Sequence, residues 1–476
     1  MDRPAAEKIY NSGKEATIEK LLELDAENKS LKEKIAQLEK TSQESSKPPS
    51  SDAPKHRRVK DNQSTSKSNK LSDRKAGGQK GHPGKNKPLV PEDEVNEFKH
   101  YYASHCKNCN KELPQDDTAN TTDDISRWQV FDIEPIKPKV TEHQAHTTVC
   151  SCGCKTKAQI PDEVLASNFG EHVIALIAYL TAVLKVPRRG IQEFFVTFLN
   201  LQICLGSIQK LLEYTSSALK KPVTELKTQL PRERVINADE TGWRDRWLWI
   251  FVNSVFIYFH VAKSRGSQVL KDVFGESYNG ILCVDRWGAY TKYHKGIIQF
   301  CWAHLKRDFS GILITGRKLK STDGILFAKI MERLQERIMA LWYDFKQGEI
   351  SRSELIEKSE PIIRLIKKCF SKYEHSEEKY VRKLPRKLLK HFDKLFVFIY
   401  HEEVEPTNNI AERGIRPAVQ WRKLCFGNRS DEGAVLTSRL LTATRTCWCQ
   451  KRNSLEYLGK VIKAYRYNSK IPSLLL

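Results

Sequence analysis

The stretch RVINADETGW constrains the fold of this chain more than any other part of the sequence. Its apolar run at 235–238 ends abruptly on Asp239 and Glu240. Two aromatic and β-branched runs follow, at 247–251 and 255–262, and a short Asn-Ser turn separates them. This pattern predicts three antiparallel strands, the first of which carries a carboxylate at its tip.

The next segment adds a helix and a fourth strand. Residues 267–274 have a helical pattern, and an apolar run at 281–284 ends on Asp285. The order of three strands, a helix and a strand, with acids at the ends of the first and fourth strands, indicates an RNase H-like core. We therefore expect an α/β fold with a mixed sheet and flanking helices.

A third acid, Glu412, lies in EPTNNIAERGIRP, where Thr407 or Asn408 can cap a helix. Phosphodiester chemistry is commonly assisted by two divalent ions held about 3.5–4 Å apart, and hard ions prefer carboxylate oxygens. Three converging acids would repel one another without a cation. Each acid could instead be a solvated end of its element, but two apolar strands that both stop on aspartate favour a site for Mg²⁺ or Mn²⁺.

Four strings carry a resemblance to a known family: ADETGW, DRWGAY, CWAHLKRDF and NNIAERGIRP, in this order. Together they resemble the transposase of the IS66 family of bacterial insertion sequences, over almost the whole chain. That family belongs to the DDE group, so the resemblance implies that Asp239, Asp285 and Glu412 form the metal-binding triad. One departure is Arg286-Trp287, where Asp-Gly or Asp-Ala is expected after the second acid.

Composition indicates the partner and the compartment. Lysine and arginine number 80 against 58 acids, a net charge of +22, which favours a polyanion such as double-stranded DNA over a membrane; a generally basic protein is the alternative. No run reaches the roughly 18–20 apolar residues that span a bilayer, and the N-terminus lacks a signal sequence. We expect a cytoplasmic, nucleoid-associated bacterial protein with reduced cysteines.

Residues 1–40 are expected to form a coiled-coil helix. A heptad seam runs from 18 to 40, with Asn28 at an a position, where a buried amide fixes register and favours a parallel pair. The seam residues are Leu21, Leu24, Asn28, Leu31, Ile35 and Leu38. A homodimer or higher oligomer is the prediction, and an amphipathic helix docked on its own protein is the alternative.

Residues 41–95 read as a flexible basic linker. Positions 41–90 carry 12 basic and 4 acidic side chains and almost no large apolar residue, so they cannot build a core. The segment either binds DNA phosphates or only solubilises the chain. The expected DNA contacts are Arg57, Arg58, Lys60, Arg74, Lys75 and Lys80.

Residues 96–160 are expected to form a zinc-binding domain. A Cys-x-x-Cys turn is followed at a distance by a cysteine group that contains a glycine, and four thiolates would bind Zn²⁺ tetrahedrally. The expected ligands are Cys106, Cys109, Cys150 and Cys152. Cys154 stays open as the fourth ligand, and one of the nearby histidines could replace a thiolate.

Residues 165–230 have a helical pattern. A helix, a turn at Gly206 and a second helix capped by Ser207 could form a helix-turn-helix within 191–220 that presents Lys210 to DNA. Helices that only support the catalytic sheet would give the same pattern, so both interpretations stay open.

The catalytic core is expected at 231–300 and 401–430, interrupted by a helical insertion with a basic surface at 301–400 and followed by helices at 431–476. Within the insertion, helices are predicted at 325–341, 355–370 and 388–400. Cys301 and His304 could touch the site, or be a core cysteine and a capping histidine. The residues expected to hold DNA phosphates near Glu412 are Arg413, Arg416, Arg422 and Lys423.

Taken together, these features predict a DNA transposase that binds element ends and catalyses metal-dependent 3′-end cleavage and strand transfer. The resemblance also suggests small accessory transposition proteins. Two other functions are consistent with the same features: a catalytically inactive DNA-binding regulator, and a nuclease with the same fold.

Overall fold

The computed structural model describes residues 10–38, 88–114, 116, 126–133 and 136–475. The described residues divide into two compact units. The smaller unit lies between 88 and Pro138, and the larger one combines the N-terminal helix with everything from Lys139 onward. Within these ranges, no helix combines the length and the hydropathy of a membrane-spanning segment.

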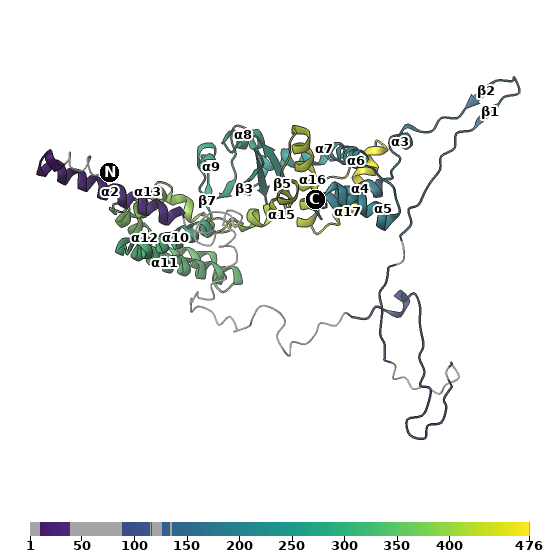
Figure 1. The fold of residues 1–476 in the computed structure, drawn as a ribbon, viewed down its shortest axis with the longest axis horizontal. Coiled ribbons are helices and arrows are strands. Elements are labelled where there is room, and N and C mark those ends of the chain that lie inside the picture. Colours follow the sequence, from purple (N-terminus) through teal and green to yellow (C-terminus); the bar gives the residue numbers. More distant parts are fainter. Residues whose placement is uncertain (1–9, 39–87, 115, 117–125, 134–135, 476) are drawn as a thin grey trace. The chain divides into compact units, whose positions relative to one another are not determined.

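The larger unit contains a five-stranded mixed sheet (Figure 1). Its strands are β3 (Val235–Trp243), β4 (Arg246–Val252), β5 (Ile257–Ala262), β6 (Ile281–Val284) and β7 (Ile298–Phe300). The order across the sheet is β5-β4-β3-β6-β7, with β3, β4 and β5 antiparallel and β3, β6 and β7 parallel. The predicted α/β class and the predicted order of three antiparallel strands, a helix and a fourth strand are confirmed.

Most of the other elements of the larger unit are helices. They are α2 (Lys14–Leu38), α3 (Asp162–Leu165), α4 (Glu171–Ala182), α5 (Arg188–Leu199), α6 (Leu205–Ala218), α7 (Lys220–Gln229), α8 (Gln268–Phe274), α9 (Gly288–Tyr293), α10 (Trp302–Leu319), α11 (Thr322–Gln347), α12 (Arg352–Tyr373), α13 (Lys379–Leu389), α14 (Val397–Tyr400), α15 (Asn409–Cys425), α16 (Asp431–Cys449) and α17 (Ser454–Arg466). Short 3₁₀ turns lie at Glu92–Glu94, Leu230–Arg232 and Phe392–Leu395.

Strand β3 is longer than the sequence predicted. Its parallel pairing with β6 stops at Asn237, but its antiparallel pairing with β4 continues to Trp243. Asp239 therefore lies inside a strand and not at its tip, which corrects the prediction. The reason is that the longer partner β4 supplies hydrogen bonds after β6 has ended. Asp239 still lies just past the end of its parallel neighbour, where side chains from β6 and β3 can meet.

Side chains of β4 alternate between the two faces of the sheet, as expected for a strand buried on both sides. Trp249 contacts Tyr290 of α9 edge to face, with ring centroids 5.9 Å apart. Ile250 points to the other face, where α15 approaches so closely that a Cβ on Gly414 would lie 2.8 Å from the Ile250 side chain. A larger residue at position 414 would therefore force the end of the Ile250 side chain to move.

Edge strand β5 is covered by helix α16. The hydroxyls of Ser438, Thr442 and Thr446, spaced four residues apart, accept hydrogen bonds from alternate backbone N–H groups of β5 at 3.0–3.1 Å. This arrangement satisfies donors that an edge strand would otherwise expose to other chains.

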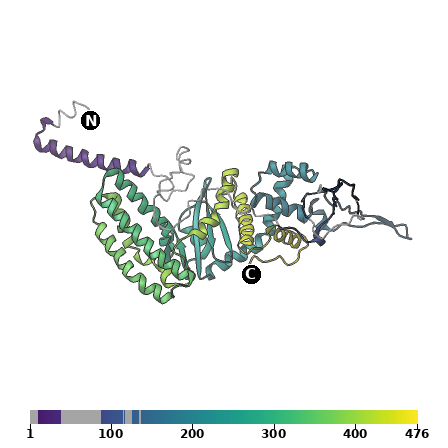
Figure 2. The same cartoon turned by 90° about the horizontal axis from the view of Figure 1, so that it is seen from below.

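The insertion after β7 is helical, as predicted, and its helices α10, α11, α12 and α13 pack side by side (Figure 2). The helix expected at 388–400 is wrong. Instead, α13 begins at Lys379 because Tyr380, Val381 and Leu384 already present its buried face. The remaining residues form a 3₁₀ turn and the short helix α14.

Helices α5 and α6 are joined by a tight turn in which Asn200 has a left-handed backbone, with φ of 48°. The predicted cap is wrong: α6 begins at Leu205, and Cys204 caps it by accepting a hydrogen bond from the Ser207 backbone N–H at 3.4 Å. Gly206 and Ser207 therefore lie in the first turn. A DNA-reading role for this helix pair stays a prediction.

The predicted heptad seam lies on helix α2, which contacts α10. Leu21, Leu31 and Ile35 nevertheless keep 61%, 48% and 55% of their surface exposed, so that contact does not bury the seam. The helix is confirmed, and self-association through it stays a prediction.

Candidate active site

Three carboxylates from three separate elements converge at one edge of the sheet. Asp239 lies in β3, Asp285 directly follows β6, and Glu412 lies in the first turn of α15. The charges of these acids interact: Asp285 and Glu412 both raise the pKa of Asp239, and Asp285 also raises the pKa of Glu412. Side chains that are 127 residues apart in the sequence are thus close in space.

Asn408 brings the third acid to the other two. Its side-chain amide donates to the Ala238 carbonyl at 2.7 Å and accepts from the Asn237 amide at 2.9 Å. Its backbone N–H donates to the Cys301 sulfur at 3.1 Å. Because Asn408 is 1% exposed and immediately precedes α15, these bonds fix the start of that helix beside Asp239. The sequence had suggested Asn408 only as a helix cap.

Burial raises the pKa values of all three acids, and like charge adds to this effect for Asp239 and Glu412. Burial is the largest cause for Asp239, and the neighbouring Glu240, Asp285 and Glu412 add to it. For Asp285, burial also raises the pKa, while the Trp287 backbone N–H and the Arg265 guanidinium act in the opposite direction. Carboxylates in such a position bind either protons or cations.

The donor set fits a hard divalent cation. Asp239 accepts a hydrogen bond from the Glu240 backbone N–H at 2.9 Å, and Asp285 accepts one from the Trp287 backbone N–H at 2.8 Å. These bonds orient each side chain through one of its two oxygens. Carboxylate oxygens that are fixed in this way are the ligands that Mg²⁺ and Mn²⁺ prefer.

Glu240 lies on the opposite side of β3 and has a separate set of partners. One of its oxygens accepts a hydrogen bond from the Arg265 Nε–H at 2.9 Å and lies 2.8 Å from a second guanidinium nitrogen of Arg265, and the other oxygen accepts a hydrogen bond from the Tyr290 hydroxyl. Its side chain is 1% exposed. Burial, followed by the charge of Asp285, raises its pKa. The sequence did not assign partners to Glu240, although alternation along a strand separates it from Asp239.

Helix α10 adds two nitrogen-bearing side chains to the third acid. Arg307 lies 3.3 Å and His304 lies 3.5 Å from the same oxygen of Glu412. Burial, with the charges of Arg307 and Arg286, lowers the pKa of His304 to about 4, so its ring is neutral at neutral pH.

Cys301 lies one helical turn before His304, and its sulfur completes a group with His304 and Glu412 whose ligand atoms lie within 4.8 Å of one another. Burial raises the pKa of Cys301 to about 11, so the thiol stays protonated. Of the two interpretations from the sequence, His304 touches the site, and Cys301 is a buried thiol that supports the start of α15.

Arg286, the cation that departs from the expected pattern, lies close enough to Asp285 to lower the pKa of that carboxyl. Its guanidinium pairs with Asp308 of α10. Its backbone carbonyl accepts a hydrogen bond from Lys387 of α13 at 3.4 Å, so the helical insertion reaches the loop that carries Asp285. Burial lowers the pKa of Lys387, and its charge in turn lowers the pKa of Asp285.

The basic residues expected to contact DNA differ in their positions. Arg413, Arg416 and Lys423 are exposed on α15, and Lys210 is exposed on α6. Arg422 is instead occupied within the protein, where it donates to the Gly242 carbonyl and to the Thr241 hydroxyl. The remaining expected contacts, Arg57, Arg58, Lys60, Arg74, Lys75 and Lys80, lie outside the described residues.

The predicted zinc ligands divide between the two units. Cys106 and Cys109 lie in a tight turn of the smaller unit, where the Asn110 backbone N–H donates to the Cys106 carbonyl at 2.9 Å. Cys150 and Cys152 lie between the short strands β1 (Thr147–Val149) and β2 (Lys155–Lys157) of the larger unit. Hydrogen bonds from neighbouring backbone groups lower the pKa values of Cys106 and Cys150, which favours the thiolate form. The four-cysteine site stays a prediction.

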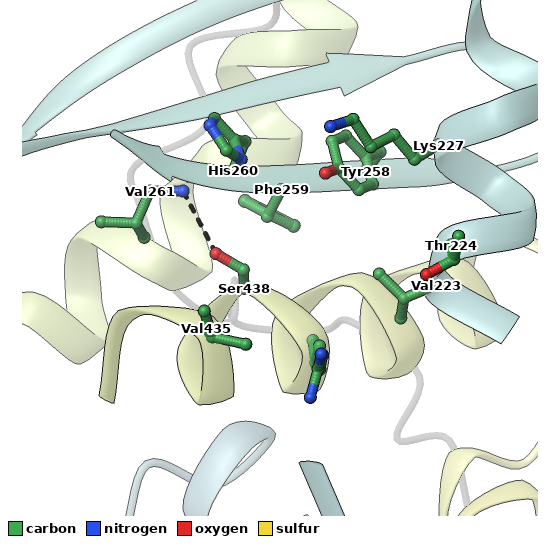
Figure 3. Close-up of a pocket in the computed structure, with 10 residues that line it drawn as sticks. Val223, Thr224, Lys227, Tyr258, Phe259, His260, Val261, Val435 and Ser438 are labelled. Carbon is green, nitrogen blue, oxygen red and sulfur yellow. Dashed lines mark hydrogen bonds between the residues drawn. The ribbon is translucent and has the colours of Figure 1, made fainter. Parts of the chain in front are cut away.

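A separate cavity of about 190 Å³ lies between α7, β5 and α16 (Figure 3). His260 and Lys227 line it together with apolar side chains, and the Val261 backbone N–H donates to Ser438 at its wall. Burial, followed by the charge of Lys227, lowers the pKa of His260 to about 4. None of the three converging acids lines this cavity.

Comparison with known proteins identifies the family of this chain. Residues 166–436, more than half of the chain, match the model of the transposase IS66 family, and this range includes all three acids. Residues 1–88 match a family of unknown function, DUF6444. A protein of Sinorhizobium fredii (strain NBRC 101917 / NGR234), named uncharacterized protein y4qI, is 26% identical over 239 residues, which is 45% of this chain and 43% of that relative. The chain thus aligns with less than half of that relative's length. On the evidence of the family match, this protein belongs to the IS66 family of transposases.

Proposed function

We propose that this transposase cleaves DNA at the 3′ ends of its element and joins them to target DNA in one site built from Asp239, Asp285 and Glu412. The observation that supports this proposal is the convergence of three partly buried carboxylates from three separate elements, each with a pKa that burial raises. An RNase H-like core is the fold that we propose for the region, because the order and directions of its five strands agree with that expectation.

In this proposal, Asp239, Asp285 and Glu412 hold Mg²⁺ or Mn²⁺. The bound ions would supply activation of the attacking oxygen and stabilisation of the leaving oxygen. The chain's own residues position the reaction: Asn408 fixes the helix that carries Glu412, and the cation Arg307 donates a hydrogen bond to that carboxylate at 3.3 Å, beside the neutral His304. Arg307 and the exposed Arg416 are also placed to contact phosphate oxygens.

The DNA path is proposed to run over basic surfaces on both sides of these acids. Helix α13 buries one apolar face and carries Lys383, Arg386, Lys387 and Lys390 outside that buried set. Lys387 connects this basic surface to the acids, since it also contacts the loop after Asp285. Helix α15 contributes Arg413, Arg416 and Lys423. Contacts of this kind bind DNA regardless of sequence and weaken as salt increases.

Two further features complete the proposal. Pairing of two chains through the exposed seam of α2 would allow one assembly to bind two element ends. Zinc bound by the cysteine turns would stabilise small segments that have few apolar residues of their own. The zinc proposal and the proposal of Mg²⁺ or Mn²⁺ at the three acids are independent of each other.

A cleavage and joining assay tests the proposed function. The substrate is a labelled duplex carrying the inverted repeat that borders the reading frame, incubated with the full chain and Mg²⁺. We expect nicking at the 3′ end and a joined product, and we expect Asp239→Asn to abolish both while binding of the duplex persists. Lys451→Asn, an exposed change on the turn after α16, is the matched control.

The outcomes separate the alternatives. Nicking without a joined product would favour a nuclease. Binding with no nicking by the unmodified chain would favour a catalytically inactive regulator and would reject the proposal.

A further inference from the structure

Trp287 is a large aromatic residue in an unusual position, two residues after Asp285. Its backbone N–H donates to the Asp285 carboxylate at 2.8 Å, and 41% of its surface is exposed. It caps the start of α9, and its ring lies outside the hydrophobic core. An exposed indole is thus tied through its own backbone to one of the three acids.

The orientation of this ring is fixed on its inner side. The indole N–H donates to the Arg265 carbonyl at 3.1 Å, and the Arg265 guanidinium carbon lies 4.1 Å from the centre of the Trp287 ring. Arg265 also lies 4.8 Å from the ring centre of Trp247, and it forms an ion pair with the buried Glu240 that includes a hydrogen bond at 2.9 Å. Trp247, Arg265 and Trp287 therefore form a stack whose middle member is held by a buried carboxylate.

Such a stack leaves a rigid, electron-rich ring with an exposed part beside the acids. A ring that is already oriented loses little conformational entropy when a flat partner stacks on it. The surroundings are cationic, since Lys387 contacts the carbonyl of the preceding residue and Arg265 lies beneath the ring. A flat group attached to a polyanion fits both features, and a nucleobase is such a group.

We propose that Trp287 stacks on a nucleobase next to the phosphate that reacts, and so positions that phosphate at the three acids. The inference rests on the proposed function and goes further, because it requires the base to be unpaired and turned out of its duplex. Every base has an aromatic face, so the contact tolerates any sequence. Its contribution is to the position of the DNA end and not to recognition of the terminal repeat.

A thermodynamic cycle tests this contact. The probe is a fluorescent duplex with a three-nucleotide 3′ overhang, and its affinity for the full chain is measured in Ca²⁺, which allows binding to be followed without Mg²⁺. One overhang base at a time is replaced by an abasic site. We expect Trp287→Ala to weaken binding roughly 10-fold, as for the loss of one stacked base. At one overhang position, the abasic site should weaken binding to the unmodified chain by the same factor. At that position, the abasic site should not weaken binding to the Trp287→Ala variant any further.

Two variants control for other roles of Trp287. Trp287→Phe keeps a stacking ring but loses the indole N–H, and it should bind within roughly 3-fold of the unmodified chain. Trp448→Ala removes another exposed tryptophan, 62% exposed and 4.2 Å from the Arg445 guanidinium, on α16 at the other edge of the sheet; it should leave affinity unchanged.

Three results would overturn the inference. First, the losses of affinity from Trp287→Ala and from the abasic site could be additive at every overhang position, which would mean that Trp287 does not contact any of the overhang bases. Trp287→Phe could bind as poorly as Trp287→Ala, which would assign the effect to the hydrogen bond with Arg265. Finally, an unmodified chain that does not nick DNA in Mg²⁺ would reject the proposed function together with the stack, whereas additive losses in a chain that does nick DNA would reject only the stack.

Discussion

The carboxyl of Asp239 illustrates how a single residue of the candidate site affects the stability of the folded protein. Burial and three neighbouring carboxylates raise its pKa. A carboxyl with a higher pKa in the folded protein than in the unfolded chain lowers the stability of the folded state as pH rises through that interval. The metal-free site is therefore under electrostatic strain at neutral pH.

Asp239→Asn should relieve that strain. We expect it to raise the Tm of the metal-free protein by a few degrees at pH 8, where about 1 kcal/mol corresponds to roughly 2–4 °C, and by less at pH 5. Added Mg²⁺ should raise the Tm of the unmodified protein and not that of the variant. Scanning calorimetry with and without a chelator measures both effects. A variant that melts below the unmodified protein at pH 8 without metal would contradict this reasoning.

Tyr290 allows a second test at a single residue, because its hydroxyl donates a hydrogen bond to the buried carboxylate of Glu240. Tyr290→Phe leaves a buried charged acceptor without that donor and should lower the free energy of unfolding by about 1–3 kcal/mol. Tyr293→Phe is the matched control on the same helix, since its hydroxyl donates only to the Gly275 carbonyl at 3.0 Å. Urea unfolding compares them, and an equal or larger loss for Tyr293→Phe would disprove the assignment.

The sequence allowed some of these residues to be predicted and not others. Asp239 and Asp285 could be predicted because each follows an apolar run, and Glu412 because it follows a capping signal. The partners of Glu240 could not, since Arg265 and Tyr290 come from other elements and their distance to Glu240 depends on the folded chain. The position of Arg422 could not be predicted for the same reason. The residues next to it in the sequence do not indicate that its guanidinium donates to the distant Gly242 carbonyl.

At the scale of elements, α16 acts as a cover for the edge of the sheet through three hydroxyls. Local pattern predicted helices in this region, and it did not predict what their threonines contact. It likewise predicted β3 only as far as its apolar run, because the polar half of that strand depends on pairing with β4. Periodicity therefore located the elements, and contacts between distant segments determined their limits.

Thr442→Val tests the cover directly. The valine has nearly the same shape but leaves the buried Phe259 N–H without its acceptor, which should lower the free energy of unfolding by about 1–3 kcal/mol. Thr444→Val is the control, because the Thr444 hydroxyl only donates back to the Leu440 carbonyl of its own helix. It should change stability by less than ~0.5 kcal/mol. Equal losses in chemical denaturation would show that the hydroxyls do not support the strand.

In the whole molecule, the larger unit contains both the three acids and helix α2, for which we propose a role in pairing two chains. The seam on α2 keeps large apolar side chains exposed. We expect the double change Leu31→Lys and Ile35→Lys to convert the protein to monomers, measured by light scattering after gel filtration. Leu22→Lys, at a residue that is 66% exposed and lies off the seam, should leave the oligomer intact. A chain that is monomeric without any change would refute pairing through α2.

We propose that Asp239, Asp285 and Glu412 together hold divalent ions. Anomalous diffraction from crystals of the full chain grown with Mn²⁺ tests whether they do. We expect anomalous density between these three carboxylates and its loss in Asp239→Asn. Density held by Cys301 and His304 away from the two aspartates, or no density near Asp239 in the unmodified protein, would contradict it.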